Sequence, residues 1–411
     1  MEVLYSRVAG LDVHKKTVVA CVLLNVEGVV RKQVRTFGTT TAQLQALCAW
    51  LRQASVTHIA LESTGSYWKP VFNLLETDET FTPWLIHPAH IKQVPGRKTD
   101  VKDAEWIAEL LHHGLLQPSY VPDRTQRELR ELTRYRTSII EERAREIHRI
   151  QKILEGANIK LSSVISNVLG VSGRRMLDAL AAGETDAAQL ASLADDRLRA
   201  TPEALQEALT GLMASHQRFL LTEQLQHLRS LDATLERLDQ EVAKRLADFH
   251  EALTLLQTIP GVGRRAAEVS LAQVGSTAEA FPSAPALAKW TGLVPGNKES
   301  AGKRLSGRTT PGNSALRSVL VEAAHAAGRT RSTYLGAQYR RAARLKGRKR
   351  AAVMVAHSLI VIIWHVLRHR TPYVDLGVDY FDRRDQERAK QQAVKRLEGL
   401  GYHVKLSQAP A

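Results

Sequence analysis

Residues 8–24, VAGLDVHKKTVVACVLL, and residues 29–37, VVRKQVRTF, decide the fold of the first part of the chain. Their many Val and Thr side chains favour extended backbone, so we predict that the two stretches form paired strands. Outward from them we expect a helix at 41–53, strands at 58–62 and 82–86, and a helix at about 101–113. This alternation predicts an α/β fold, with a small mixed sheet flanked by helices.

Two long helices are predicted in the middle of the chain. The first runs over residues 123–158, and the second carries an apolar seven-residue repeat of Leu221, Leu228, Leu235, Val242 and Phe249. We predict that they form a coiled coil, within one chain or between chains, which Arg143 and Arg245 weaken locally at seam positions. The alternative is a helix packed on its own domain.

The rest of the chain is predicted to be mainly α-helical. Residues 161–214 are rich in Ala and Leu and predict a helical insert with breaks near Gly170, Gly173 and Gly183. We therefore expect four parts: an α/β domain at 1–122, a helical coiled-coil region at 123–250, a helical C-terminal domain at 251–375, and a charged tail at 376–411.

The chain is strongly basic, because its 57 Lys and Arg exceed its 42 Asp and Glu by 15. Such a surface favours nucleic acid as a partner, although an ordinary basic enzyme is the alternative. With two cysteines and no secretory pattern at the N-terminus, we expect a cytoplasmic protein close to the nucleoid. Residues 351–367 are apolar but contain His357 and His365, so we expect a buried helix and no membrane span.

Four acids form a candidate metal site. Asp12 lies within an apolar strand, and Glu62 ends another strand before a glycine turn. Asp100 and Asp103 are three residues apart at the start of a helix and therefore share a face. Carboxylates are preferred ligands of Mg²⁺, and a pair of such ions activates an oxygen nucleophile and stabilises the leaving oxygen of a phosphodiester. Each acid taken alone is more simply a helix cap or a salt-bridge partner.

Three motifs that contain these acids resemble the DEDD transposases of the insertion-sequence 110 and 1111 family, which includes Piv-type and MooV-like DNA invertases. They are GLDVHK at 10–15, LESTG at 61–65 and PGRKTDVKDA at 95–104. The likeness continues in IPGVG at 259–263 and from Gly307 through Gly312 to Arg317, so it spans residues 8 to about 373. It implies a ribonuclease-H-like (RuvC-like) N-terminal domain, a coiled coil and a C-terminal transposase domain.

The resemblance also implies site-specific recombination of DNA by a serine nucleophile, with Mg²⁺ or Mn²⁺ held by Asp12, Glu62, Asp100 and Asp103. Ser300, in KESAGKR at 298–304, is the best match for that nucleophile, and Ser306 is the alternative. Ala301 stands where the family more often has glycine. The resemblance further implies a homodimer or homotetramer and a structured non-coding guide RNA (bridge RNA) that selects donor and target DNA by base pairing.

The C-terminal domain contains candidate contacts to nucleic acid. Gly261 and Gly263, followed by Arg264, resemble a helix-hairpin-helix turn whose backbone N–H groups approach a phosphate, although a plain turn between helices is the alternative. Residues 303–350 are rich in Lys and Arg and contain a single acid, Glu322. We expect Tyr334 and Tyr339 either to stack on bases or to pack in the protein. Phosphate binding is assigned to Lys303, Arg304, Arg308 and Arg317.

Two other functions fit the same sequence. The first is a RuvC-like structure-specific endonuclease (a junction resolvase) that uses metal-activated water, or a DNA invertase that works without a guide RNA. The second is a non-catalytic nucleic-acid-binding protein whose acids are structural. A covalent protein–DNA adduct distinguishes a serine recombinase from the first, and substitution of Asp12 and Asp103 tests the second.

Overall fold

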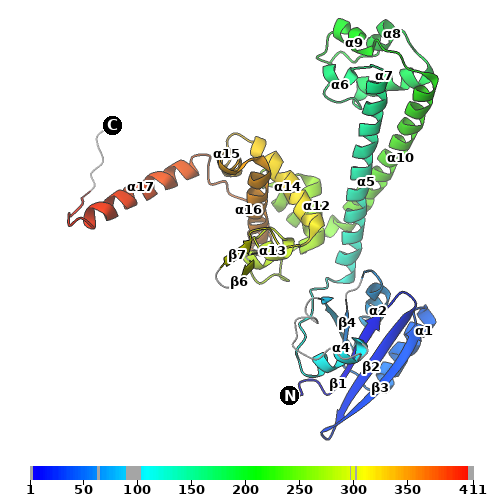
Figure 1. The fold of residues 1–411 in the computed structure, drawn as a ribbon, viewed down its shortest axis with the longest axis vertical. Coiled ribbons are helices and arrows are strands. Elements are labelled where there is room, and N and C mark those ends of the chain that lie inside the picture. The colour runs from blue at the N-terminus through cyan, green and yellow to red at the C-terminus, as the bar shows by residue number, and fades with distance from the viewer. Residues whose placement is uncertain (1–2, 63–64, 89–102, 297, 301–302, 406–411) are drawn as a thin grey trace. The chain divides into compact units, whose positions relative to one another are not determined.

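The computed structural model describes residues 3–62, 65–88, 103–296, 298–300 and 303–405. The backbone divides into two compact units, Met1–Arg124 and Thr125–Ala411. The first unit is an α/β layer, and the second is α-helical apart from a two-stranded hairpin (Figure 1). The prediction of an α/β part followed by mainly helical parts is confirmed.

The N-terminal unit is built on a five-stranded mixed sheet with the strand order β3-β2-β1-β4-β5. β1 pairs antiparallel with β2 and parallel with β4, and β5 pairs parallel with β4. The strands are β1 (Arg7–Val13), β2 (Thr17–Val26), β3 (Val29–Gly38), β4 (His58–Glu62) and β5 (Thr82–Ile86).

The chain reverses within residues 8–24, which therefore form two strands and not the one that we expected. The backbone amide of His14 donates to the carbonyl of Thr17 and closes the reversal. A second reversal joins β2 to β3 through Glu27 and Gly28, whose φ angles are 53° and 84°. Two successive positive φ angles are typical of a type I′ hairpin turn.

Helices cover both faces of the sheet. α1 (Thr41–Gln53) and α2 (Trp68–Leu75) pack on the face that carries Leu11 and Leu61. α4 (Asp103–His112) packs on the opposite face, which carries Val8, Cys21 and Ala60. The alternation of side chains along each strand thus supplies both cores, and we name the two sides the α1 face and the α4 face.

Two long helices, α5 (Arg124–Gly156) and α10 (Ser215–Arg245), pack side by side in the second unit. They are antiparallel, because Glu128 pairs with Arg245 and Arg143 pairs with Asp232. Arg143 and Arg245 therefore form ion pairs between the helices, and do not simply weaken the repeat as we expected. The seven-residue repeat thus joins two helices of one chain, and its buried members include Leu221, Leu228, Leu235 and Val242.

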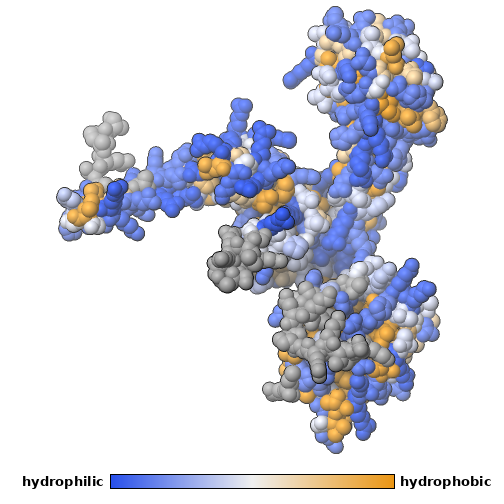
Figure 2. Space-filling view, viewed as in Figure 1, coloured by the Kyte–Doolittle hydropathy of each residue, from blue (hydrophilic) through white to orange (hydrophobic). Residues whose placement is uncertain are grey.

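A cap of short helices lies at the end of this pair where α5 ends and α10 begins. It consists of α6 (Leu161–Val164), α7 (Val171–Ala182), α8 (Ala187–Ser192) and α9 (Pro202–Leu209). The chain breaks at Gly170 and Gly183 as predicted, but Gly173 lies inside α7, so a break there was wrong. A Cβ atom on Gly173 would lie 2.1 Å from the carbonyl oxygen of Val168, so close packing explains this glycine. Figure 2 shows hydrophobic residues at the surface of the cap, where Leu212 is 89% exposed.

The remaining helices share one hydrophobic core. They are η1 (Ala247–Phe249), α11 (His250–Gln257), α12 (Arg264–Val274), α13 (Ala284–Thr291), α14 (Ser314–Arg329), α15 (Tyr334–Lys346) and α16 (Arg348–His369). β6 (Lys298–Ser300) and β7 (Lys303–Ser306) form the antiparallel hairpin between α13 and α14. Side chains of Ser283, Asn313 and Thr333 accept hydrogen bonds from amides in the first turns of α13, α14 and α15, which fixes where these helices begin.

α16 contains the apolar stretch 351–367. Among the described helices it alone is long and apolar enough to cross a membrane. Half of its most apolar stretch is buried within the protein. Ala352, Val355, Leu359 and Ile363 lie in the shared core, so this is a core helix as predicted. The tail beyond it forms α17 (Tyr380–Glu398), whose described side chains are exposed or half-buried.

Candidate active site and nucleic-acid interface

Asp12 and Glu62 lie next to each other on the sheet. β1 and β4 are parallel neighbours in which Leu11 is opposite Leu61, so the residues that follow are adjacent, about 5 Å apart between backbones. Since Leu11 and Leu61 point to the α1 face, Asp12 and Glu62 point to the α4 face. Both carboxylates are partly exposed at the ends of their strands.

Asp103 is the exposed first residue of α4. This helix runs antiparallel to β1, because His112 at its far end hydrogen bonds to the carbonyl of Tyr5, before the strand begins. The start of α4 is therefore at the Asp12 end of β1. Three of the predicted acids thus belong to one end of the sheet and to one face of it.

Gly10 allows α4 to lie directly on β1. A Cβ atom at this position would lie 2.3 Å from the carbonyl oxygen of Ala104 and 2.4 Å from the amide nitrogen of Ala108. Any larger residue would push the helix, and Asp103 with it, away from the strand that carries Asp12. The glycine of the GLDVHK motif therefore has a positional role that its sequence context did not reveal.

His14 is a residue of this site to which the sequence analysis gave no role. Its Nε2 atom lies 2.9 Å from Oδ2 of Asp12, and its side chain is 63% exposed. This contact could have been predicted, because side chains two residues apart in extended backbone, such as Asp12 and His14, point to the same side. A cation bound to Asp12 would compete with this contact.

The donor set suits a hard divalent cation, because carboxylate oxygens are preferred ligands of Mg²⁺. Within the described residues, however, no group of three or more His, Cys, Asp and Glu is close enough to hold a metal ion. Asp100, the fourth predicted ligand, lies outside the described residues. Asp12, Glu62 and Asp103 thus come from the same end of the sheet, but the described residues do not form a metal site.

The two candidate nucleophiles lie at opposite ends of the β6–β7 hairpin. Ser300 ends β6 at the turn and is opposite Lys303, whereas Ser306 ends β7 and is opposite Lys298 at the base of the hairpin. The base is continued by a bridge between Pro295 and Thr309. Ser300 therefore lies at the turn end of the hairpin, and Ser306 lies at its base.

The glycine turn before α12 has two different glycines. The amide of Val262 donates to the carbonyl of Ile259, and Gly261 has a φ of +87°, as the third residue of a type II turn requires. A Cβ atom on Gly261 would lie 2.4 Å from the carbonyl oxygen of Ala323, so Gly261 packs on α14 and does not face a ligand. Gly263 has nothing within 4 Å of its Cβ position and remains open to solvent. Only Gly263 keeps the geometry expected of a phosphate contact.

The predicted phosphate-binding cations have different surroundings. Arg264 donates through Nε to Oε1 of Glu268 at 2.9 Å, so its charge is already paired. Arg317 is half-buried on α14, and Arg308 is exposed after β7. Lys303 and Arg304 lie in strand β7. This ion pair could have been predicted from the sequence, because Arg264 and Glu268 are four residues apart on one helix.

Tyr334 and Tyr339 pack within the protein. Tyr334 is stacked on Phe381 of α17, with ring centroids 5.2 Å apart and planes at 15°. Burial and the neighbouring Tyr380 raise the pKa of Tyr334. The Tyr339 hydroxyl lies 2.9 Å from Nδ1 of His325. Neither ring is therefore free for base stacking.

Two transposase family models match the chain. Residues 9–159 match the DEDD transposase model of the IS110 group, and residues 253–340 match the model for the transposase IS116/IS110/IS902 family. The chain belongs to the IS110 family of transposases. It is therefore a DNA transposase, an enzyme that acts on DNA, and the motif resemblance is confirmed. No curated protein matches the chain.

The Gly312–Asn313 pair of this transposase has a structural role. A Cβ atom on Gly312 would lie 2.4 Å from the amide nitrogen of Gly292, so the loop after β7 lies directly on the end of α13. The Asn313 side chain caps α14 and also donates through Nδ2 to Oε1 of Gln273 at 2.7 Å. Both residues thus fix the start of α14 and the exit of the hairpin that carries Ser300.

An ion network centred on the buried Arg136 and Glu268 attaches α12 of the transposase to its long helices. Arg136 of α5, which is 1% exposed, donates through Nη1 to Asp239 at 2.9 Å and to Glu268 at 2.6 Å. Arg264 and Arg265 bind the same two acids from α12. Burial raises the pKa of Asp239, but the arginines outweigh it and hold this pKa below its usual value. The helix after the glycine turn is therefore fixed by charge to both α5 and α10.

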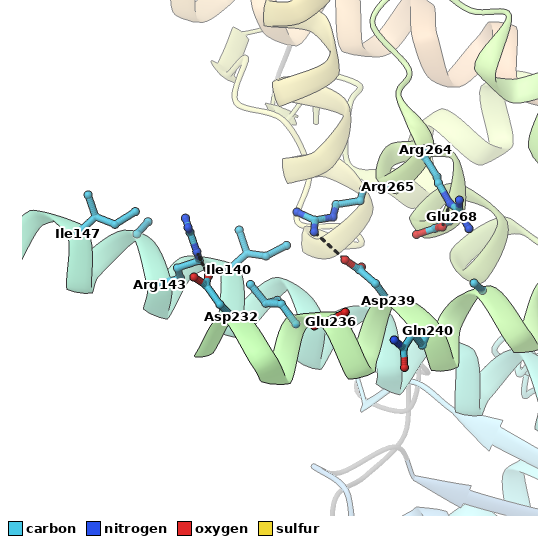
Figure 3. Close-up of a pocket in the computed structure, with 13 residues that line it drawn as sticks. Ile140, Arg143, Ile147, Asp232, Glu236, Asp239, Gln240, Arg264, Arg265 and Glu268 are labelled. Carbon is cyan, nitrogen blue, oxygen red and sulfur yellow. Dashed lines mark hydrogen bonds and ion pairs between the residues drawn. The ribbon is translucent and has the colours of Figure 1, made fainter. Parts of the chain in front are cut away.

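A cleft of about 870 Å³ lies between α5, α10 and α12 (Figure 3). Its apolar lining includes Ile140, Ile147 and Leu235. Figure 3 shows Arg265 pointing from α12 towards Asp239 on α10. Most of its charged lining residues are paired, Arg143 with Asp232, Arg265 with Asp239 and Arg264 with Glu268, so the cleft borders the ion network.

Proposed function

We propose that this transposase is a site-specific DNA recombinase in which Ser300 attacks a phosphodiester, while Asp12, Glu62, Asp100 and Asp103 hold Mg²⁺ or Mn²⁺. The serine oxygen would bond to phosphorus, and the oxygen of the cut strand would leave as a hydroxyl group. Reversal of this exchange with another strand end rejoins the DNA. The energy of each broken phosphodiester is thereby kept in the phosphoserine link.

One observation carries the metal part of this proposal. Asp12 and Glu62 end parallel neighbouring strands on the α4 face, and Asp103 begins the helix that covers that face. Three carboxylates from three separate elements thus belong to one end and one face of the sheet, which supports a shared divalent cation as their ligand. The five-stranded mixed sheet around them supports a ribonuclease-H-like (RuvC-like) domain at 1–122.

The ion would supply Lewis-acid stabilisation of the developing charge on phosphate and leaving oxygen. Side chains of the protein would orient the phosphate. The exposed Arg308 would contribute positive charge close to the β6–β7 hairpin. Gly263 would offer a backbone N–H to a phosphate at the start of α12.

Trapping of the covalent protein–DNA adduct tests the nucleophile. The full chain is incubated with donor and target DNA and Mg²⁺, denatured, and digested to map the modified serine by mass spectrometry. Ser300→Ala should abolish the adduct, whereas the matched Ser306→Ala should retain it. An adduct on Ser306, or cleavage without any adduct, would contradict the assignment.

Cleavage without an adduct would instead support the RuvC-like endonuclease, in which the acids activate water. This alternative mechanism needs only the acids of the N-terminal unit. It predicts that Ser300→Ala cuts DNA as fast as the parent chain does.

The remaining parts of the proposal concern assembly and targeting. We propose that α5 and α10 form a coiled-coil region at 123–250, followed by a transposase domain at 251–375 and a tail at 376–411. A homodimer or homotetramer would bring the acids of one chain to the serine of another. A structured guide RNA would select the DNA, and its removal should stop recombination without unfolding the chain; a DNA invertase would not need it.

A further inference from the structure

α15 and α16 form a helical hairpin whose connection is the single residue Gly347. The helices pack along each other, and Nε2 of Gln338 donates to Oγ of Ser358 at 2.9 Å across them. Gly347 has a φ of +80°, which favours glycine, and nothing lies within 4 Å of its Cβ position. The connection is therefore tight and open to solvent.

Five cations surround this connection, and we name them the basic tip: Arg344, Lys346, Arg348, Lys349 and Arg350. All five are exposed. Ala351 and Ala352, which follow directly, are 0% and 1% exposed, so the tip is held on a rigid core helix. The charges are thus presented on a firm support and not on a loose loop.

The basic tip is not compensated by acids. The sequence contains no Asp or Glu between Glu322 and Asp375. On α15, Arg341 forms an ion pair with Asp385, one turn before the tip. Among the described side chains, none of the five tip cations has an ion-pair partner.

This arrangement is unfavourable for the isolated protein. Arg348, Lys349 and Arg350 occupy the first turn of α16, where the helix dipole favours negative charge, and that turn contains no acid. The tip residues also repel one another. Elsewhere in the same unit, Arg143 and Arg245 of the long helices have acidic partners. The contrast indicates that the tip charges serve contact with an external anion.

A row of cations continues from the tip along α15. Arg340 and Arg344 are four residues apart on one helix face, which is about 6 Å along the axis. Arg340 donates to the carbonyls of Thr330 and Arg331, so the exposed Arg331 extends the row. A spacing of about 6 Å is close to twice the rise of about 3.4 Å along the duplex axis at which each strand carries a phosphate. The row therefore suits a run of phosphates better than a single small anion.

We propose that the basic tip and this row bind the phosphodiester backbone of a nucleic acid, at a surface separate from the glycine turn and from the β6–β7 hairpin. The inference rests on the proposed function for the choice of polyanion, duplex DNA or structured RNA. Contact of this kind supplies affinity and orientation without reading sequence.

The test compares two variants of the full chain with equal loss of charge. The tip variant is Arg344→Gln, Lys346→Gln and Arg348→Gln together. The matched control is Arg145→Gln, Lys152→Gln and Arg199→Gln, three exposed cations of the same unit outside the tip. Binding to a duplex of about 30 base pairs and to a structured RNA of similar charge is measured against salt concentration, without Mg²⁺.

Each lost contact to duplex DNA should lower the slope of log affinity against log salt by about 0.9. The tip variant should therefore lose about 2 to 3 in slope and at least about tenfold in affinity, while the control keeps both. Loss with DNA alone or RNA alone identifies that polyanion as the ligand, and loss with both assigns the surface to backbone in general. Equal behaviour of the two variants with both probes would overturn the proposal.

The binding assay needs neither metal nor cleavage, so it is independent of the acids and of Ser300. Thermal unfolding provides a second measurement. The tip variant should unfold at the same or a higher temperature than the parent, because repulsion is relieved. A lower unfolding temperature would show that the cations stabilise the fold and would count against a ligand-binding role.

Discussion

The acids at the end of the sheet and a group of acids in the helical unit of this transposase have different surroundings. In the second unit, Asp232, Asp239 and Glu268 each accept hydrogen bonds from two arginines. In the N-terminal unit, Asp12 has an ion pair with the exposed His14, and no described group pairs with Asp103. Both sets are acids on regular elements, but only one has its charge fully matched.

The difference agrees with the proposal that the acids of the sheet bind a metal ion, whereas the acids of the second unit join helices. An acid between two guanidinium groups has its lone pairs and its charge satisfied, so it attaches elements to one another and has no need of a further cation. In the proposed function, Asp12 and Asp103, which have no arginine partner among the described residues, bind the metal ion. Experiments that neutralise one set or the other should give different kinds of loss.

Neutralising the acids of the sheet should have the largest effect. Asp12→Asn and Asp103→Asn should each lower DNA cleavage by at least about 1,000-fold, because metal-held charge is lost from the reaction. Folding and DNA binding should persist. The matched control is Asp78→Asn, an acid of the same unit that pairs with Arg52 at 2.6 Å and should keep its activity. Cleavage within a few-fold of the parent would make the sheet acids structural.

Breaking the arginine network should instead reduce stability. Arg136→Met leaves Glu268 and Asp239 without their shared partner, and should lower the free energy of unfolding by about 3–5 kcal/mol. Urea denaturation followed by circular dichroism measures this loss. The double variant Arg136→Met with Glu268→Leu should regain part of it. A loss below about 1 kcal/mol for the single variant would contradict a structural network.

The two glycines of the turn before α12 provide a smaller test within one motif. Gly261→Ala should cost about 2 kcal/mol or more, because of its φ of +87° and its contact with Ala323. Gly263→Ala has open space and should cost under about 1 kcal/mol, while weakening DNA binding. Equal losses of stability in the two variants would contradict the division of roles.

The smallest effect is expected from pH. Burial raises the pKa of Asp232, but hydrogen bonds from Arg143 and Arg174 outweigh it and place the folded pKa below the usual value. A depressed pKa stabilises the fold above the unfolded pKa of about 3.9, and this contribution is lost as the pH falls through the folded pKa. Asp232→Asn should therefore cost up to about 1 kcal/mol at pH 7 and nothing in strong acid. If the stability cost of Asp232→Asn did not change with pH, the charge of Asp232 would not explain it.

Much of the fold could be predicted from local patterns. The helix at 41–53 and the strands at 58–62 and 82–86 have the predicted bounds, because apolar periodicity and flanking turn residues coincide there. The reversal at 14–16 was missed, because valines before and after it read as one continuous strand. The pairing of the long helices within one chain could not be predicted, since a seven-residue repeat does not specify its partner.

The candidate site was only partly predictable. That Asp12 and Glu62 are neighbours depends on the parallel pairing of β1 and β4, which no local pattern encodes. The role of Gly10 depends on how α4 packs, and the different roles of Gly261 and Gly263 depend on α14. Arg264 was assigned to phosphate, although Glu268 one turn later was an available partner. Residue types thus indicated the chemistry, and tertiary packing decided which residues were free for it.

The antiparallel pairing of α5 and α10 also sets an order of events during synthesis. Glu128 and Arg245 pair although they are 117 positions apart, so the ribosome needs roughly 6–23 s between them at about 5–20 residues per second. At the start of that interval the apolar stripe of α5 has no partner yet from α10. The small helical cap, which emerges in between, folds from nearby residues and returns the chain towards α5. α5 and α10 would then pair progressively from the cap towards the arginine network. Assembly of this network would be the last step before α12 is fixed.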